Sequence, residues 1–462
     1  MHGDFSLNPL AYRHRVSRVL SQQGRVQLDS DANEQTETVL RAVHGLAADL
    51  IGAHGGLGDS FEVFAPDPAK PAELAIRSGV YYVDGLRCVN FPVGFEPFGF
   101  FDIPPAPFSA LTGTPYKDQP DYYPLDDWNK VDGSDAVLFY LDVFERHVAA
   151  AQDDTLREVA LLGPDTCSRA VLVWQLRAMP AQGVRVALAE VLKQPPQSKL
   201  PPSWDAPYLA LNLLLRSGVR MRAQAKPTET TEPCTISPDA RFRGAENRLY
   251  RVEIHDVGGE KSKPSFKWSE DNGSIVYPIR KIEGSTVHLD SLGRDDRTTL
   301  RVNDWVEVVD DKVFLMGIAN PLLQVVDVRP HAVTVTLSAP PQDGAGDPKL
   351  RPILRRWAGA PVSITEAAKV DEAWTPLSEG IEVQFSFQAP PKAHYRTGDY
   401  WLIPARTALG DVLWPHDGKV PRAVTAHGID HHYAPLALVM VQDNTNVTSY
   451  RRSFASLSKA VK

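Results

Sequence analysis

The sequence predicts a mainly β protein (α+β class) of several small β-sandwich or barrel modules, with an N-terminal arm and helix and long ordered loops. Two observations carry this prediction. Prolines outnumber glycines, 38 to 31, and they separate short apolar runs, a pattern typical of many short strands joined by turns. The apolar fraction of 43% and charged fraction of 23% are those of an ordinary globular chain, and 462 residues can bury sizeable cores.

The first predicted element is an arm and helix spanning residues 1–56. An extended arm runs from Phe5 through Gln22-Gln23-Gly24-Arg25 and leads to a helix with Asp31 as its expected N-cap and Glu34 completing a capping-box variant. Apolar residues then recur at helical spacing, as far as a stop at Gly55-Gly56: Val39, Leu40, Val43, Leu46, Ala47, Leu50 and Ile51. An exposed arm before an amphipathic helix suits a protein that docks its N-terminus onto a neighbour.

Residues 57–222 form the next predicted unit, a β-rich domain. Two strands flank a turn at Asp84-Gly85, and the nearly continuous apolar run at 137–144 predicts a strand buried on both faces. The aromatic and proline-rich residues 94–134 show no periodicity and predict a long ordered loop.

Three further segments complete the predicted organisation. Residues 223–245 are rich in Pro and Thr and predict a linker. Residues 246–350 predict a small β-barrel or sandwich, in which Asn272-Gly273 is the strongest hairpin signal of the chain. Residues 351–462 predict a C-terminal β-rich section.

Charge and targeting signals bound the partners and the compartment. The net charge is 49 − 57 = −8 and no basic tract is present, which argues against nucleic acid as a partner. No apolar leader and no run of eighteen apolar residues occur, so we expect a cytoplasmic protein with no membrane span. Cys88, Cys167 and Cys234 lack CxxC spacing, so neither structural zinc nor a disulfide framework is favoured.

Two clusters resemble metal sites only in part. Asp29, Asp31 and Asn33 have the spacing of the first calcium ligands of an EF-hand, but Glu34 and Leu40 stand where that loop needs Gly and a bidentate Glu. In the stretch 427–432, adjacent histidines on a strand would point to opposite faces, so hydrogen-bonded structural histidines are favoured over a metal site.

Signals of catalysis are weak. Glu270 and Asp271 are neighbours in a predicted turn, whereas a glycosidase needs two carboxylates facing each other across a cleft. No GxSxG, HExxH, Walker or GxGxxG motif occurs. The six tryptophans from Trp268 to Trp414 suit either a sugar-stacking platform or, as their irregular spacing favours, core and interface positions. We therefore expect no enzyme, no catalytic residue, no bound metal and no cofactor.

The opening stretch GDFS…RVLSQQGRVQLDSDANEQ resembles the N-terminal signature, of the type QQGRVxLDxDxNEQ, of an uncharacterised family found in gene clusters for phage-tail-like contractile injection systems. The resemblance continues in blocks such as YLDVFERHV (140–148), ENRLYRVEIH (246–255) and FKWSEDNGS (266–274), and so covers nearly the whole chain. Ser30 and Ala32 depart from it, since relatives are expected to have Ala and Trp there.

The resemblance implies a structural, non-enzymatic subunit of an oligomeric ring or cage at the baseplate or spike of a bacterial toxin-delivery particle. Its expected partners are baseplate, spike, sheath or tube proteins and copies of itself, and assembled particles are expected to be released from the cell. The alternative is a receptor- or carbohydrate-binding tail protein of the same particle, and a glycan hydrolase is a third reading. The expected interface residues are polar or aromatic residues of the arm and first helical turn: Phe5, Gln22, Gln23, Arg25, Asp29, Asn33 and Glu34.

Overall fold

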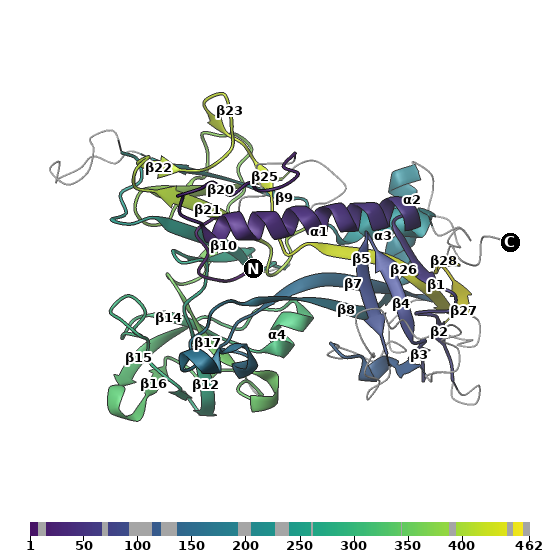
Figure 1. Cartoon of the computed structure of the whole chain (residues 1–462), viewed down its shortest axis with the longest axis horizontal. Coiled ribbons are helices and arrows are strands. Elements are labelled where there is room, and N and C mark those ends of the chain that lie inside the picture. The colour runs from purple at the N-terminus through teal and green to yellow at the C-terminus, as the bar shows by residue number, and fades with distance from the viewer. Residues whose placement is uncertain are drawn as a thin grey trace. The chain divides into compact units, whose positions relative to one another are not determined.

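A computed structural model of the chain confirms the predicted mainly β fold, with 40% strand and 17% helix in several separate sheets (Figure 1). It describes residues 1–7, 15–66, 73–91, 113–121, 136–192, 205–226, 240–259, 262–342, 344–387, 394–440 and 447–455. Most of the predicted loop 94–134 and of the predicted linker 223–245 lies outside the described residues. Among the described helices, none has the length and apolar character needed to cross a membrane.

The chain divides into two compact units, each assembled from three stretches that are far apart in the sequence. The first unit comprises Met1–Thr36, Arg146–Val171 and Ser217–Ile429. The second unit comprises Glu37–Glu145, Leu172–Arg216 and Asp430–Lys462. The five segments predicted from the sequence are each continuous, because apolar patterns reflect only neighbouring residues. The two observed units are discontinuous, because strands that are far apart in the sequence pair with each other.

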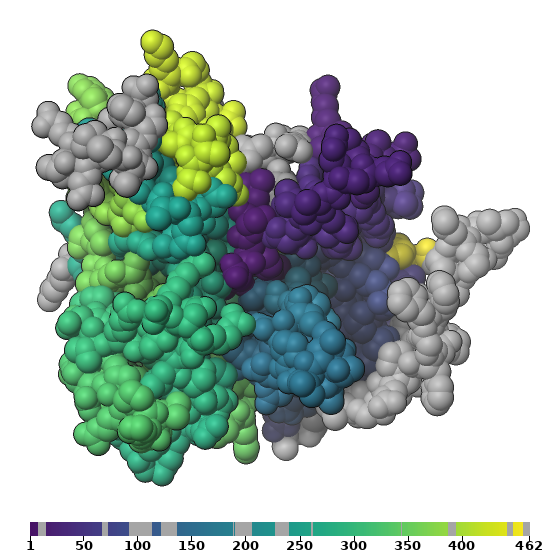
Figure 2. All heavy atoms as spheres, turned by 60° about the vertical axis from the view of Figure 1, so that its left-hand side comes forward, coloured from purple at the N-terminus to yellow at the C-terminus, as the bar shows by residue number. Residues whose placement is uncertain are grey.

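Helix α1 (Asp29–Ile51), purple in Figure 1 and Figure 2, begins two residues before the predicted N-cap. Leu28 occupies the N-cap position, and its backbone N–H donates to the Asp31 carboxylate at 3.4 Å. Asp31 therefore has the position of the acidic residue in a capping box, whose side chain accepts from the N-cap N–H, and the predicted N-cap was wrong by three residues. The helix ends at Gly52, whose positive φ of 93° suits glycine, while Gly55 and Gly56 belong to the following strand.

The second unit has three sheets. The first runs in the order β28 (Ser453–Phe454), β1 (His54–Leu57), β4 (Gly79–Val83) and β5 (Leu86–Asn90). The second runs in the order β2 (Val63–Phe64), β3 (Ala75–Ile76) and β6 (Thr114–Pro115), followed by the 3₁₀ turn η3 (Tyr116–Asp118). The third runs in the order β27 (Val447–Ser449), β26 (His431–Met440), β7 (Ala136–Val148) and β8 (Arg169–Pro180), where only the far ends of β7 and β8 belong to the first unit.

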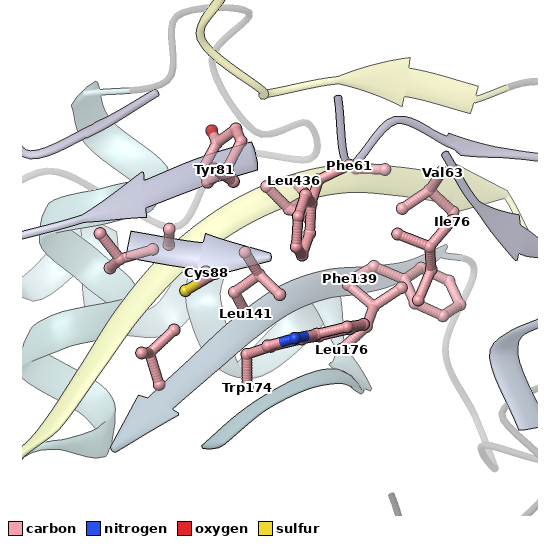
Figure 3. Close-up of a cluster of buried hydrophobic side chains, with 14 of the residues drawn as sticks. Phe61, Val63, Ile76, Tyr81, Cys88, Phe139, Leu141, Trp174, Leu176 and Leu436 are labelled. Atoms are coloured by element: carbon pink, nitrogen blue, oxygen red, sulfur yellow. The ribbon is translucent and has the colours of Figure 1, made fainter. Parts of the chain in front are cut away.

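The core of the second unit lies among these sheets (Figure 3). Phe139, Leu141 and Trp174 from β7 and β8 pack against Phe61 and Tyr81, and the Phe61 and Trp174 rings meet edge-on with centroids 5.0 Å apart. The continuous apolar run of β7 is buried along residues 136–144, as the sequence predicts. The other face of β7 and β26 packs against α2 (Ala181–Leu192) and α3 (Asp205–Leu215), which lie side by side.

The first unit contains a β-sandwich. One layer has the order β18 (Val362–Ser363), β11 (Ser265–Ser269), β10 (Arg248–Asp256), β21 (Tyr400–Arg406) and β22 (Asp411–Val412). The other has the order β19 (Thr375–Pro376), β20 (Ile381–Phe387), β9 (Val219–Ala225) and β25 (Val424–Thr425), and a small hairpin pairs β23 (His416–Asp417) with β24 (Val420–Pro421). Apolar side chains from both layers, among them Phe266, Phe385 and Trp401, form one buried core.

A closed six-stranded barrel completes the first unit. Its order is β12 (Val276–Glu283), β13 (Thr286–Leu289), β16 (Thr334–Leu337), β15 (Leu323–Arg329), β14 (Trp305–Val309) and β17 (Ile353–Trp357), with β17 closing onto β12. Short connections accompany it: α4 (Asp311–Met316), η7 (Pro330–Ala332) and η8 (Pro348–Leu350).

One turn prediction holds and another fails. Asp84-Gly85 joins the paired strands β4 and β5, as predicted. Asn272-Gly273 also has positive φ at both residues, of 50° and 62°, but it does not close a hairpin. Strand β11 before it pairs with β10 and β18, and strand β12 after it pairs with β13 and β17, so this turn passes the chain from the sandwich to the barrel.

Adjacent valines of β15 provide a matched test of the barrel core. Val325 is fully buried and Val326 is 49% exposed, because neighbouring side chains on a strand face opposite sides. We expect Val325→Ala to lower the free energy of unfolding by about 2 kcal/mol and Val326→Ala to change it by less than about 0.5 kcal/mol. Urea denaturation of both variants checks this, and equal effects would contradict the assignment of the two faces.

Candidate functional site

The first residues of the chain are bound inside the first unit. The Met1 carbonyl accepts hydrogen bonds from the Arg251 guanidinium at 3.1 Å and from the Asn272 side-chain amide at 3.3 Å. The same amide donates to the Gly3 carbonyl at 2.9 Å. A side chain on Gly273 would bring its Cβ within 2.8 Å of the His2 ring, so the close approach of this segment requires a glycine there.

The segment reaches a buried network of charged side chains. The Glu253 carboxylate accepts from Arg251 Nε at 2.6 Å, lies 3.0 Å from His2 Nε2 and forms an ion pair with Lys267 at 3.3 Å. Lys267 Nζ also donates to Glu307 Oε2 at 2.7 Å. Burying such charges is stable only when each one is paired and hydrogen-bonded, as these are.

The electrostatics of the network keep Glu253 ionised and His2 neutral. Burial alone would raise the pKa of Glu253, but the charges of Arg251 and Lys267 outweigh it and hold that pKa well below its usual value. Burial, together with repulsion from Arg251 and Arg355, lowers the pKa of His2 well below its usual value. A neutral His2 can then donate Nε2–H to the Glu253 carboxylate, so the site holds its histidine as an uncharged donor.

Phe5 and Asp29, two predicted interface residues, hold the arm to its own unit. Ser6 donates through its backbone N–H and hydroxyl to the two Asp29 carboxylate oxygens, at 2.9 and 2.5 Å. Partial burial would raise the pKa of Asp29, but these hydrogen bonds outweigh it and lower the pKa. The Phe5 ring packs on an apolar cluster of the sandwich, and Arg406 donates to the Ser6 carbonyl at 2.5 Å.

The remaining predicted interface residues fall into two groups. Gln22, Gln23 and Arg25 are exposed in a tight turn where Arg25 N–H donates to the Gln22 carbonyl at 3.4 Å. Asn33 is exposed on the first turns of α1, whereas Glu34 is buried. All seven residues belong to the first unit. Phe5 and Asp29 are linked through Ser6, and the others lie on the arm turn and on the first turns of the helix.

Helix α1 carries its apolar residues on the outside. Four residues that the periodicity assigned to an apolar face are half-exposed or more: Val39 51%, Val43 55%, Leu46 61% and Leu50 75%. The buried positions of the helix are instead polar: Ser30, Glu34 and Thr38, which follow one another at intervals of four residues. We call Val39, Val43, Leu46 and Leu50 the α1 ridge. All four belong to the second unit.

The β4–β5 turn fixes the helix behind the ridge. A Cβ on Gly85 would lie 2.0 Å from the His44 carbonyl oxygen, so the turn and the helix backbone are in direct contact. The neighbouring Asp84 carboxylate is held by His432 Nδ1 at 2.9 Å and by the Tyr208 hydroxyl at 3.0 Å. Partial burial alone would raise the pKa of Asp84, but the contact with His432 outweighs this effect, and the pKa is lower than usual.

Other candidate residues have structural contacts. His431 Nδ1 lies 2.6 Å from the Asp142 carboxylate, and His427 Nδ1 accepts from the Leu402 backbone N–H at 3.0 Å. Within the described residues, no group of three or more His, Cys, Asp or Glu side chains is arranged to hold a metal ion. The Asp271 carboxylate pairs with Arg248 at 3.0 Å.

The residues that bind the N-terminal segment were not predicted from the sequence. Arg251, Glu253 and Lys267 alternate with apolar residues on β10 and β11, a pattern that normally marks a solvent-facing side. The available clue is that these side chains carry charges of both signs on the paired strands β10 and β11, where opposite charges can neutralise each other.

The fold and this site define a multi-module β protein whose N-terminal helix presents an apolar ridge. Comparison with known families then identifies the chain: residues 1–197 and 214–456 match the model of DUF6519, a family of unknown function, and the chain belongs to this family. No curated protein and no solved structure matches the chain.

Removing the charge of Glu253 tests the network. Glu253→Gln leaves Arg251 and Lys267 without their shared carboxylate, and we expect the free energy of unfolding to fall by about 3–5 kcal/mol. Glu283→Gln, which removes a carboxylate from an exposed pair with Lys281, should leave stability unchanged. Urea denaturation at pH 7 compares the two variants, and equal stabilities would show that the buried network contributes little.

Buried histidines predict a loss of stability in acid. Burial lowers the pKa of His427 to about 4, so between its usual pKa near 6.5 and pH 4 the unfolded chain binds a proton that the folded chain does not. As the pH is lowered through this window, the free energy of unfolding should therefore decrease, by up to about 1.4 kcal/mol per pH unit for this histidine. His427→Asn can still accept from Leu402 N–H and should show a shallower loss between pH 6.5 and 4.5 than the unmodified protein. An identical slope would contradict the assignment.

Proposed function

We propose that this chain is a structural subunit of a phage-tail-like contractile injection system, assembled by protein contacts at the baseplate or in a cage around the baseplate and spike. The observation that carries the proposal is the α1 ridge, together with the resemblance of the N-terminal stretch to proteins of such gene clusters. A helix that buries Ser30 and Thr38 while exposing Leu46 and Leu50 is arranged for a partner outside its own fold.

The ridge has the spacing of a helix-packing seam. Its members are separated by four, three and four residues, as the a and d positions of a heptad are. Helix α1 is already formed and is held against Gly85, so binding of a partner helix does not require the unfavourable nucleation of α1. In an antiparallel pair of two copies, each layer would match one valine with one leucine, Val39 with Leu50 and Val43 with Leu46. Copies of this chain and helices of neighbouring baseplate, spike, sheath or tube proteins are the partners this surface fits.

The exposed arm turn adds a polar element to the proposed interface. Gln22, Gln23 and Arg25 are exposed, and they lie within the stretch that carries the resemblance. Amide and guanidinium groups there can bond the backbone or the acids of a neighbour. Phe5 and Asp29 act differently: Phe5 packs the base of the arm on the sandwich, and Asp29 bonds the arm at Ser6 to the start of α1.

The alternative of a carbohydrate-binding tail protein has less support. Of the six tryptophans between Trp268 and Trp414, three are buried in the core: Trp357, Trp401 and Trp414. The other three are half-buried, so none forms an open stacking platform. We likewise propose that the chain has no catalytic function, and that it assembles in the cytoplasm into a particle that is later released.

Ridge variants test assembly directly. In a strain that depends on the variant gene, Leu46→Ser with Leu50→Ser should abolish incorporation of the subunit into particles imaged by electron microscopy. The change should shift the free energy of unfolding by less than about 0.5 kcal/mol, because both side chains are exposed. Val186→Ser on α2, where the side chain is 42% exposed in the same unit, is the matched control. Normal particles from the double variant, or intact baseplates with unchanged outer density in a strain lacking the gene, would overturn the proposal.

The arm turn is tested separately. Gln22→Ala, Gln23→Ala and Arg25→Ala together should weaken assembly and leave the fold intact, since all three side chains are exposed. Thermal unfolding checks the fold, and subunit occupancy in purified particles checks assembly. Full occupancy would mean that the arm contacts only its own unit.

A further inference from the structure

A small loop of the first unit exposes three large aliphatic side chains at its tip. The loop joins β7 to β8 and contains two 3₁₀ turns, η5 (Asp154–Leu156) and η6 (Val159–Leu161) (blue in Figure 2). Val159 is 83% exposed, Leu161 61% and Leu162 98%. We call these three residues the aliphatic tip. Single exposed leucines are ordinary, but three within four residues form a patch that needs an explanation.

The loop is closed by hydrogen bonds at its base. Arg157 and Asp165 form an isolated antiparallel bridge. Glu158 N–H donates to the Pro164 carbonyl at 3.1 Å, and Gly163 N–H donates back to the Glu158 carbonyl at 2.9 Å. The Arg157 guanidinium adds bonds to Asp154 at 3.0 Å and to the Gly163 carbonyl at 3.3 Å.

Both 3₁₀ turns are capped by acidic side chains. Asp153 accepts from Thr155 N–H at 3.0 Å, and Glu158 accepts from Ala160 N–H at 2.8 Å. Because these bonds hold the backbone without an apolar core, the tip is ordered while its side chains face solvent. An aliphatic group presented on a backbone that is already ordered loses little conformational entropy when it binds.

The conformation of Leu162 points to selection for binding and not for folding. Its φ is 70°, in the left-handed region that favours glycine, and its side chain is almost fully exposed. The leucine therefore strains the backbone and contributes no burial to this chain. Glycine would suit the position better, so the benefit of the leucine side chain must come from outside the fold.

We propose that the aliphatic tip inserts into an apolar pocket with a basic rim on another protein chain. The rim follows from charge: residues 153–165 carry four carboxylates, Asp153, Asp154, Glu158 and Asp165, and one basic side chain, Arg157. Asp154 pairs with Arg157 at 3.0 Å, and Asp165 lies 3.9 Å from Arg294 outside the loop. Lysine or arginine side chains around the pocket would complement the net negative charge of the loop. The same charge repels anionic lipid head groups, which favours a protein over a membrane. The inference does not depend on the type of particle proposed above.

Photocrosslinking in the full-length protein tests this docking. Val159→p-benzoylphenylalanine, expressed in the cells that make the protein, should crosslink to an apolar residue of another chain that has lysines or arginines beside it. Adding Leu162→Gly should reduce the crosslinked fraction at least tenfold and leave the melting temperature unchanged or higher, because glycine relieves the positive φ. Leu409→Ser, which changes a leucine of the same unit that is 62% exposed, should leave the crosslink intact.

The opposing outcomes are distinct. Crosslinks confined to the same chain, crosslinks to an acidic surface, or a crosslinked fraction unaffected by Leu162→Gly would overturn the inference. So would sedimentation of the purified protein with phosphatidylglycerol vesicles that is lost in Leu162→Gly. A crosslinked partner with a basic-rimmed pocket that belongs to no injection particle would support this inference and contradict the proposed function.

Discussion

The first unit depends on neutralising one buried carboxylate. Glu253 lies in the middle of β10 and is buried; Arg251 pairs with it from the same strand and Lys267 from the paired strand β11. Lys267 carries the contact on to Glu307 of the barrel, and His2 closes the remaining side. A single electrostatic requirement thus joins the sandwich, the barrel and the beginning of the chain, which apolar packing alone would leave as separate modules.

The sequence predicts the strands well where local signals and burial agree. The apolar run of β7 and the Asp84-Gly85 turn are both read correctly, because each depends on neighbouring residues. Asn272-Gly273 has the right local conformation, yet its flanking strands belong to different sheets. Which strands pair is decided by contacts between distant residues, including the bonds from Asn272 to the N-terminal segment, and no local pattern contains them.

Local sequence patterns predict the candidate site less well than they predict the strands. Periodicity correctly finds an amphipathic α1 but cannot say which face is buried, and the usual assumption that the apolar face packs inward is wrong here. Asp29 and Phe5 were predicted to contact a neighbour; in the structure Asp29 bonds Ser6 of the arm, and Phe5 packs on the sandwich. Glu253 and Lys267 were not predicted as site residues, because a polar residue on a strand is normally a surface residue.

The contact between Gly85 and the His44 backbone implies that position 85 and the exposed face of α1 tolerate substitution very differently. Any side chain at position 85 would push the helix off its support, so this glycine should persist for as long as the helix keeps its place. The side chains of the α1 ridge are half-exposed or more, so their exchange disturbs the fold far less than a side chain at position 85 would. In relatives whose partners differ, we therefore expect substitutions on the exposed face of α1 and a retained glycine in the turn beneath it.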